Sequence, residues 1–366
     1  MNILLIGPLP PLRGGISDFN KELLKNLNKI HKVEAISFTH LYPKFIFPGK
    51  SQFGSEIIND FEIKVINPYN PISYFATLNQ IRKSKPDKII STHWNPIFSI
   101  SYCLINFLSS TKIEKIGIMH NVKSHENSFF DNLFLKFYLK SIDKTVCLSR
   151  HTNKEIDSFY KTNSISLFHP IPQLNQKCID RENAISKMKL DPKKKYLLHF
   201  GIIRKYKGLT LLLRSLKKVI AKNKAVHLII AGEFYESVEK YKNLIIDLEL
   251  QNHVTIENTF IPEKDFFKWF SISDFIIQAN TSATQSGVTA LSIYFEKIMI
   301  STASGGIKEI LNEKNSYLCQ KNINSISSRI LEAFESDNND KKLEIQKLKK
   351  NLQWNKFSKD LIKFIK

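Results

Sequence analysis

Short apolar runs alternate with amphipathic helical patterns along most of the chain, and this alternation most constrains the fold. The first run, Asn2–Gly7, has the length and composition of a buried strand, and apolar residues then recur on one helical face between Ile16 and Ile30. Because parallel strands need crossover connections, repeats of this unit predict α/β sheets covered by helices on both faces. Further strands are expected at 33–38, 88–91, 116–120, 145–148, 196–201, 225–231, 254–257, 275–278 and 298–301.

The alternation is interrupted once, and the interruption predicts a domain boundary. Two domains are the natural expectation for 366 residues. Open α/β sheets bind ligands outside the carboxyl ends of their strands, so two doubly wound, Rossmann-like domains facing each other across a cleft are expected. We place an N-terminal domain at 1–172, a linker at 173–195, a C-terminal domain at 196–351 and a final amphipathic helix at 352–366.

The composition indicates a globular protein, with 42% hydrophobic and 11% aromatic residues. The opening MNILLIGPLPP reads as a strand and a turn rather than as a signal peptide. The most apolar stretch, 97–108, is shorter than the roughly 18 residues needed to span a bilayer. Four scattered cysteines without metal-like spacing favour a reducing compartment, so we expect a cytoplasmic location.

A net charge of +20 suggests an anionic partner, although it is also compatible with a Lys-rich composition that serves only solubility. The lysines are dispersed, and no basic stripe with interleaved aromatics is present, which disfavours nucleic acid. Segment 128–144 mixes aromatics with lysines at 136, 140 and 144, and it is a candidate for contact with an anionic membrane face. The alternative is a core helix with snorkelling lysines.

The first loop, GPLPPLRGGIS at 7–17, joins the first strand to the first helix. Gly14 and Gly15 allow a ligand to approach the backbone, and a helix N-terminus favours an anion. The spacing is not GxGxxG, which disfavours a dinucleotide-binding dehydrogenase. The alternative is an ordinary glycine turn.

A second loop carries cations between a strand that ends at Gly201 and a helix expected at 208–222. Arg204 and Lys207 are spaced to hold a diphosphate. Each charge-assisted hydrogen bond contributes about 1.5–3 kcal/mol, whereas a helix N-terminus adds about 0.3–1 kcal/mol, so the side chains would dominate. The alternative is two solvated basic residues.

Residues 275–295 carry no charged side chain, although 24% of the chain is charged. The middle of this run is rich in hydroxyls and amides, and a helix is expected at 288–295. Gln285, Ser286 and Gly287 at its start could bind sugar hydroxyls and phosphates, or could simply cap a buried helix. Another strand ends at His120-Asn121, where a histidine could face a ligand or be structural.

These segments together resemble glycosyltransferase family 4, retaining enzymes of the GT-B fold, over nearly the whole chain. The resemblance rests on the order and spacing of Gly14-Gly15, His120-Asn121, FGIIRKYKG at 200–208, LIIAGE at 228–233, QSGV at 285–288 and SGGIKE at 304–309. It implies that Arg204 and Lys207 hold the donor diphosphate and act in catalysis with His120. It also implies that the final helix crosses back onto the N-terminal domain. The donor-binding set it implies is Gly14, Gly15, Gly201, Thr259, Phe260, Ile261, Gln285, Ser286, Gly287 and Val288, with 259–261 beside the base.

The chain departs from the usual family pattern of two Glu residues in the loop and helix at 285–293. Gln285 stands at or near the first position, and Leu291 or Ser292 at the second, so the chain is similar to a subset with Gln-Ser-Gly-Val. Retention by two carboxylates needs groups about 5–5.5 Å apart. An uncharged run offers no such nucleophile, which favours deprotonation of the acceptor by the leaving diphosphate. No Asp-x-Asp motif is present, and the resemblance implies metal independence and no cofactor beyond a UDP-sugar or GDP-sugar donor.

The predicted function is a retaining glycosyltransferase that acts on a glycan or lipid-linked saccharide in bacterial surface polysaccharide biosynthesis, at the inner face of the cytoplasmic membrane. The alternative is a catalytically inactive nucleotide-sugar-binding homologue that scaffolds a polysaccharide assembly. The missing Glu pair favours the alternative, whereas Arg204, Lys207 and His120 favour the enzyme.

Overall fold

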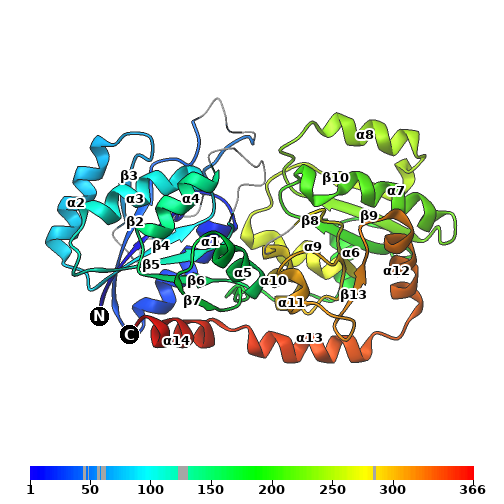
Figure 1. Ribbon diagram of the computed structural model, residues 1–366. Coiled ribbons are helices and arrows are strands. Elements are labelled where there is room, and N and C mark those ends of the chain that lie inside the picture. The colour runs from blue at the N-terminus through cyan, green and yellow to red at the C-terminus, as the bar shows by residue number, and fades with distance from the viewer. Residues whose placement is uncertain (44–46, 48, 56–57, 59–62, 123–130, 283–285) are drawn as a thin grey trace. The chain divides into compact units, whose positions relative to one another are not determined.

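The computed structural model describes residues 1–43, 47, 49–55, 58, 63–122, 131–282 and 286–366. The chain divides into two compact units. Unit 1 comprises residues 1–170 together with 352–366, and unit 2 comprises residues 171–351. Each unit is a parallel sheet with helices packed on it (Figure 1). Within the described segments, no helix has both the length and the apolar character needed to cross a bilayer.

Unit 1 contains a parallel sheet of seven strands in the order β3-β2-β1-β4-β5-β6-β7. The central strands are runs of Ile and Leu because both faces of the sheet are covered. The strands are β1 (Asn2–Ile6), β2 (Lys32–Phe38), β3 (Ile63–Ile66), β4 (Lys88–His93), β5 (Glu114–Met119), β6 (Lys144–Cys147) and β7 (Asn163–Ser166).

Two apolar cores lie on the two faces of this sheet. One core receives Tyr74, Tyr102 and Leu135 from α2, α3 and α4. The other receives Phe19 from α1 and Trp354 from α14. The C-terminal helix α14 therefore packs within unit 1, beside α1. The helices of unit 1 are α1 (Gly15–Asn28), α2 (Ile72–Ser84), η1 (Pro96–Phe98), α3 (Ser99–Leu108), α4 (Asp131–Lys140), α5 (Arg150–Phe159) and α14 (Trp354–Ile365).

Unit 2 contains a parallel sheet of six strands in the order β10-β9-β8-β11-β12-β13. The strands are β8 (Lys195–Phe200), β9 (Val226–Ala231), β10 (Val254–Glu257), β11 (Phe275–Gln278), β12 (Met299–Thr302) and β13 (Ser316–Cys319). The helices are α6 (Arg181–Lys187), η2 (Lys205–Lys207), α7 (Leu209–Ile220), α8 (Val238–Asp247), η3 (Gln251–His253), η4 (Glu263–Asp265), α9 (Phe266–Ile272), α10 (Gly287–Tyr294), α11 (Ile307–Ile310), α12 (Ile323–Glu335) and α13 (Asn339–Asn351).

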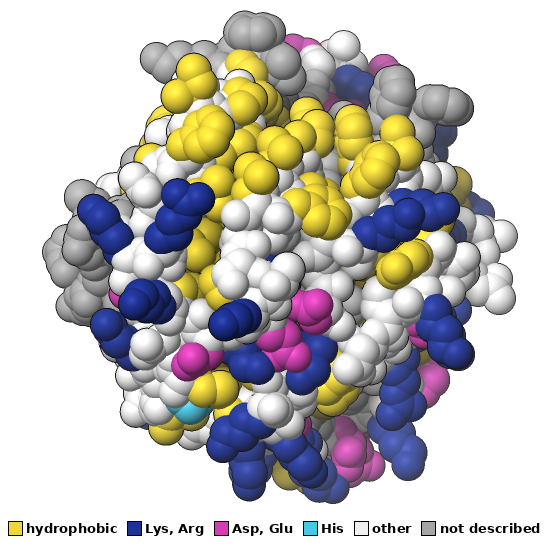
Figure 2. Space-filling view, turned by 60° about the vertical axis from the view of Figure 1, so that its left-hand side comes forward, with side chains coloured by type: hydrophobic (Ala, Val, Ile, Leu, Met, Phe, Trp, Pro, Cys, Tyr) yellow, Lys and Arg dark blue, Asp and Glu magenta, His cyan; other side chains and the backbone are white. Residues whose placement is uncertain are grey.

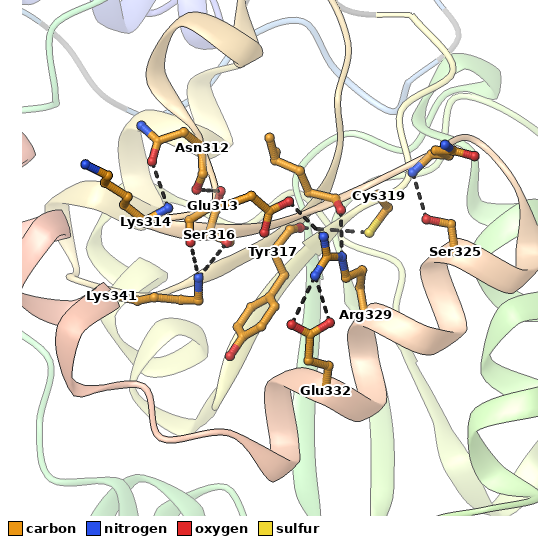
Figure 3. Close-up of polar contacts among 12 residues, drawn as sticks. Asn312, Glu313, Lys314, Ser316, Tyr317, Cys319, Ser325, Arg329, Glu332 and Lys341 are labelled. Carbon is orange, nitrogen blue, oxygen red and sulfur yellow. Dashed lines mark hydrogen bonds and ion pairs between the residues drawn. The ribbon is translucent and has the colours of Figure 1, made fainter.

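A polar network joins β13, the edge strand of this sheet, to α12 and α13 (Figure 3). The Arg329 guanidinium on α12 donates to Leu318 O at 3.0 Å and reaches the carboxylates of Glu313 and Glu332 at 2.9 and 2.8 Å. Lys341 on α13 donates to the carbonyl oxygens of Glu313 and Ser316. The network satisfies backbone acceptors beside the sheet edge, which would otherwise need water.

The segment expected to be a linker, 173–195, is not wholly a linker. It contains α6, which Asp180 caps by accepting from the backbone N–H of Asn183. Ala184 and Ile185 of this helix are buried in the core of unit 2, and α6 packs against α9. The helix is only seven residues long and follows a proline-rich stretch, so its helical periodicity was too short to identify from the sequence.

Burial of Trp354 predicts a large stability effect in unit 1. Its indole is 1% exposed and packs against the Phe19 ring, with ring centroids 5.1 Å apart. We expect Trp354→Ala to lower the free energy of unfolding of unit 1 by about 3–5 kcal/mol, because a large cavity replaces the indole. Chemical denaturation followed by circular dichroism measures this change. Asn355→Ala, an exposed position on the same helix, is the control, and equal stability of the two variants would contradict the packing argument.

Candidate active site

The strand order of each sheet marks one position where connections diverge. In unit 2 the chain proceeds from β8 through β9 to β10 on one side, and then returns to place β11 against the other side of β8. Unit 1 repeats this arrangement around β1 and β4. Open α/β sheets bind ligands at the carboxyl ends of the strands at such a switch point. The loops after β8 and β11 are therefore the first candidates for a site in unit 2.

The loops after β8 and β11 are locked together by backbone contacts. The N–H of Thr281 donates to Tyr206 O at 2.7 Å. Gly208 has φ 69°, and a Cβ at this position would lie 2.0 Å from Ala279 O, so no other residue fits without movement of the backbone. This contact fixes the turn that carries Arg204 and Lys207 against the end of β11.

Lys207 is a buried cation in this turn. Lys207 is only 7% exposed. Arg204, three residues earlier, is half-buried, and its guanidinium lies 4.9 Å from the centroid of the Tyr235 ring. Burial lowers the pKa of Lys207 to about 8, and the nearby charge of Arg204 lowers it further. Among the described residues no carboxylate forms an ion pair with either cation. Two adjacent positive charges that form no ion pair with the described carboxylates are suited to an anionic ligand.

Several neutral polar atoms near these cations are buried without a hydrogen-bond partner. The Nδ1–H of His199 on β8 donates to Ile277 O at 3.1 Å, which leaves Nε2 as an acceptor. Burial and then the charge of Lys207 lower the pKa of His199 to about 4, so the ring is neutral. In the described part of the chain, His199 Nε2, Gln278 Nε2, Asn280 Oδ1 and Thr289 Oγ1 have no partner.

These buried groups were not singled out as site residues from the sequence. Gln278 and Asn280 lie within the uncharged run at 275–295, and that run was the signal that could have found them. Their burial could not be read from the sequence, since it follows from the pairing of β11 with β8 and β12. Unpartnered buried polar atoms are uncommon in folded proteins, and they mark positions where a ligand or water is expected.

The start of α10 lies beside the same loops. The Ser286 hydroxyl donates to Gln278 Oε1 at 3.1 Å and accepts from the N–H of Thr289, so it caps the helix. Gly287 is exposed, and a Cβ placed there would have no neighbour within 4 Å. Val288 is buried, and its methyl group lies 3.4 Å from the position that a Cβ on Gly201 would occupy. Gln285 lies outside the described residues.

The segment expected beside the nucleotide base divides into exposed and buried parts. Thr259 and Phe260 are exposed, and the Thr259 hydroxyl donates to Glu257 Oε1 at 2.9 Å. Ile261 is buried in the core of unit 2, so its side chain stabilises the loop rather than offering a free surface. Phe260 is therefore the side chain of this segment best placed to stack on a base.

Gly14 and Gly15 lie at the start of α1 in unit 1. Gly14 has φ 122°, a conformation that favours glycine, and it precedes the helix without a side-chain cap. A Cβ at either glycine would have no neighbour within 4 Å. The first turn of a 14-residue helix therefore has backbone N–H groups that no side chain covers.

His120 follows β5 in unit 1 and is 3% exposed. Its ring meets Phe19 of α1 edge-on with centroids 4.5 Å apart, and its Nε2 has no partner among the described residues. Burial, reinforced by His169 and His93, lowers the pKa of His120 well below its ordinary value. A neutral imidazole here can donate or accept a hydrogen bond, but it does not supply a positive charge near neutral pH.

The predicted site residues therefore fall into two groups. Unit 2 brings Gly201, Arg204, Lys207, Ser286, Gly287 and Val288 to its switch point, whereas Gly14, Gly15 and His120 belong to unit 1. Their roles in binding and catalysis stay predictions. In the described ranges, no three His, Cys, Asp or Glu side chains converge to hold a metal ion.

Comparisons with known proteins match this fold. Residues 180–351 match the family described as "Glycosyl transferases group 1". An uncharacterized glycosyltransferase of Methanocaldococcus jannaschii is 23% identical over 350 residues, which cover 92% of this chain and 89% of that protein. Sucrose-phosphate synthase from Thermosynechococcus elongatus has a TM-score of 0.78 at 11% identity, with 100% of this chain and 98% of that chain covered. The Anabaena protein HepE in complex with UDP has a TM-score of 0.75 at 12% identity, with 100% and 99% covered.

The structural likenesses establish the fold as GT-B, with two Rossmann-like units. The family match covers most of unit 2, the unit that carries Arg204 and Lys207, and together with the archaeal relative it supports a glycosyltransferase. The narrower resemblance to family 4 and its Gln-Ser-Gly-Val subset stays a prediction.

Lys207 makes a testable contribution to stability. Its pKa falls from 10.5 to about 8 on folding, so below pH 8 the buried ammonium destabilises the folded unit. The shift corresponds to about 3 kcal/mol. We expect Lys207→Met to raise the free energy of unfolding by about 1–3 kcal/mol at neutral pH, because a neutral chain of similar shape removes the desolvation cost.

The gain should shrink as the pH rises from 8 toward 10.5, since wild-type Lys207 is then neutral in the folded state. Denaturant titrations at several pH values measure it. Lys205→Met, an exposed position in the same turn, is the control and should change little. A loss of stability in Lys207→Met would show that the ammonium has a stabilising partner.

Proposed function

We propose that this protein is a retaining glycosyltransferase that moves a sugar from a nucleoside diphosphate sugar to a glycan or lipid-linked saccharide. The observation that carries the proposal is the buried Lys207 beside Arg204, with no carboxylate paired to either in the described residues. A desolvated cation pair is costly in a free protein, and a diphosphate is the ligand that would neutralise it. The UDP found in the HepE structure, which has the same fold, supports this ligand class.

The two cations would act mainly in the transition state. As the bond between sugar C1 and the diphosphate oxygen breaks, negative charge grows on the leaving diphosphate, and Arg204 and Lys207 stabilise it. The acceptor hydroxyl attacks C1 on the face from which the diphosphate departs. Its proton passes to a phosphate oxygen of the leaving group, so no protein carboxylate is needed. Neutral His120 would contribute a hydrogen bond to the sugar.

The neutral groups of unit 2 would recognise the rest of the donor. Gly287 and the first turn of α10 offer backbone N–H groups, and the unpartnered atoms of Gln278 and Asn280 lie near the end of β11. Phe260 would stack on the base, which we propose is that of UDP or GDP. The proposed setting is bacterial surface polysaccharide synthesis at the inner face of the cytoplasmic membrane, without a metal or further cofactor.

Donor binding tests the cation pair directly. Each charge-assisted contact is worth about 1.5–3 kcal/mol, so Arg204→Ala and Lys207→Ala should each weaken UDP or GDP binding by about 10- to 100-fold. Thermal shift and calorimetric titration with UDP, GDP and their sugar conjugates measure this effect, with Lys205→Ala as the matched control. Transfer of a labelled sugar should fall at least as far. Unchanged binding and turnover in both variants would refute the proposal, whereas tight binding without turnover on any acceptor would favour the inactive homologue.

The pKa of Lys207 predicts how binding depends on pH. An anion needs the protonated amine, and the free protein loses that proton as the pH rises through about 8. We therefore expect the affinity for a UDP-sugar, whose diphosphate has no ionisation near neutral pH, to be constant just below this pH and to fall above it, approaching about tenfold per pH unit. Lys207→Arg keeps its charge, so its affinity should stay flat over the same range. A decline of equal size in both proteins would assign the titration to another group.

A further inference from the structure

The outer surface of three helices in unit 1 is unusually apolar. Helix α3 buries Tyr102 and Ile105 in the core, yet its opposite side exposes four further apolar residues. They are Ile100, Leu104, Phe107 and Leu108, at the spacing of a single helical face. A surface helix normally has a polar outer face, so a helix that is apolar on both sides needs a second apolar environment.

The neighbours of α3 extend this surface on both sides. Helix α2 exposes Ile72 and Phe75, which are 75% and 68% accessible, and α4 exposes Leu133 and Phe137. Helix α3 contacts both α2 and α4. Figure 2 shows hydrophobic side chains gathered on the face of the molecule that carries these helices. We call the exposed apolar residues of α2, η1, α3 and α4 the apolar face.

A groove crosses the apolar face between α2 and α3. Its volume is about 250 Å³, and it is lined by prolines, aromatics and aliphatic residues that include Tyr69, Ile97 and Leu104. Among the described residues, no charged side chain lines it. The groove is therefore suited to a hydrocarbon chain rather than to a sugar or a phosphate.

Cations outnumber acidic residues along the apolar helices, and most of them lie at the C-terminal ends of α2, α3 and α4, where Asp87 is the exposed acidic neighbour. The helices and their flanking turns expose Arg82, Lys83, Lys85, Lys112, Lys136 and Lys140. The only acidic residue within 67–85, 95–112 and 131–140 is Asp131, and it is buried. Apolar side chains framed by lysines and arginines match the layering of an anionic membrane, in which hydrocarbon lies beneath negative headgroups.

We propose that the apolar face of α2, η1, α3 and α4 docks on an anionic lipid bilayer. Its aromatic and aliphatic side chains enter the headgroup–acyl boundary, and the six cations contact lipid phosphates. Self-association through this face is disfavoured, because a two-fold interface would bring the cations of one copy close to those of the other. The proposal extends the proposed function, since it places the protein where a lipid-linked acceptor would be found.

The structure corrects the lysine set expected for such a contact. Lys144 is an ion-pair partner of Glu114 at 3.0 Å and also donates to Phe364 O, so it stabilises unit 1 instead of facing lipid. Lys136 and Lys140 are exposed on α4, whereas the stronger apolar contribution comes from α2 and α3, outside the segment 128–144.

Vesicle binding by the full chain tests the proposal without donor or acceptor, so its failure is independent of the proposed transferase activity. We expect co-sedimentation with equimolar phosphatidylglycerol and phosphatidylcholine vesicles, and much weaker binding to phosphatidylcholine alone. Phe75→Ser combined with Phe107→Ser should weaken binding to the mixed vesicles at least about tenfold, since both side chains lose their burial in the bilayer.

Exposed apolar positions in unit 2 provide a matched control. Ile246 and Leu343 are 56% and 55% exposed on α8 and α13, so Ile246→Ser with Leu343→Ser should bind vesicles as the wild type does. Thermal unfolding of both double variants checks that they fold. If the apolar-face variant binds vesicles as tightly as the control, or if the wild type does not bind them, the proposal is wrong.

The charge contribution is measured in the same assay. Lys136→Glu with Lys140→Glu should weaken binding several-fold more than Lys342→Glu with Lys350→Glu, which changes the net charge equally at exposed positions of α13. Equal losses would show that only net charge matters and would overturn the specific face. Analytical ultracentrifugation distinguishes a second copy as the occupant. A wild-type dimer that Phe75→Ser with Phe107→Ser dissociates would replace the membrane by a self-interface.

Discussion

The candidate site of unit 2 depends on the burial of one cation, Lys207. A desolvated ammonium next to Arg204 is unfavourable, and its burial lowers the pKa of Lys207 to about 8. Gly208 against Ala279, and Thr281 bonded to Tyr206, hold the turn in place. Neutral polar residues such as His199 and Gln278 lie near this turn, and a carboxylate in their place would offset the positive charge of Lys207 and Arg204.

The sequence predicted most strands well, because both faces of parallel sheets are covered and the strands are therefore apolar runs. Val254–Glu257 and Phe275–Gln278 are observed with the predicted bounds. It did not predict β3, β7, β13 or α6. The three strands have only four residues each, three of the four in Asn163–Ser166 are polar, and a seven-residue helix shows too little periodicity. The cations of the candidate site could be proposed from their position after a strand. The burial of Lys207, His199 and Gln278 could not, because it depends on contacts between distant strands.

The apolar face shows that the hydrophobicity of a segment does not by itself predict whether its side chains are buried. Residues 97–108 are too short to span a bilayer and would ordinarily be assigned to a core. The fold buries seven of these twelve residues and exposes the other five, all of which are apolar. A helix with two apolar sides can join a folded unit to a lipid surface while the sheet behind it remains unchanged. The proposed docking side chains would then differ from the proposed diphosphate-binding side chains of unit 2, so that each set can be altered without the other.

The contact of Gly208 with Ala279 also affects how a ligand would be selected. The turn that carries the cations is joined through backbone atoms to Ala279 and Thr281, just after β11, so a shift of one segment is opposed by the other. A donor with an ill-fitting sugar would push on the α10 side and thereby misplace Arg204 and Lys207. A donor with the wrong sugar would then form weaker contacts between its diphosphate and the two cations. Both its binding affinity and its rate of transfer would be lower. Because the two loops are joined, the fit of the sugar would determine how well the cations stabilise the diphosphate.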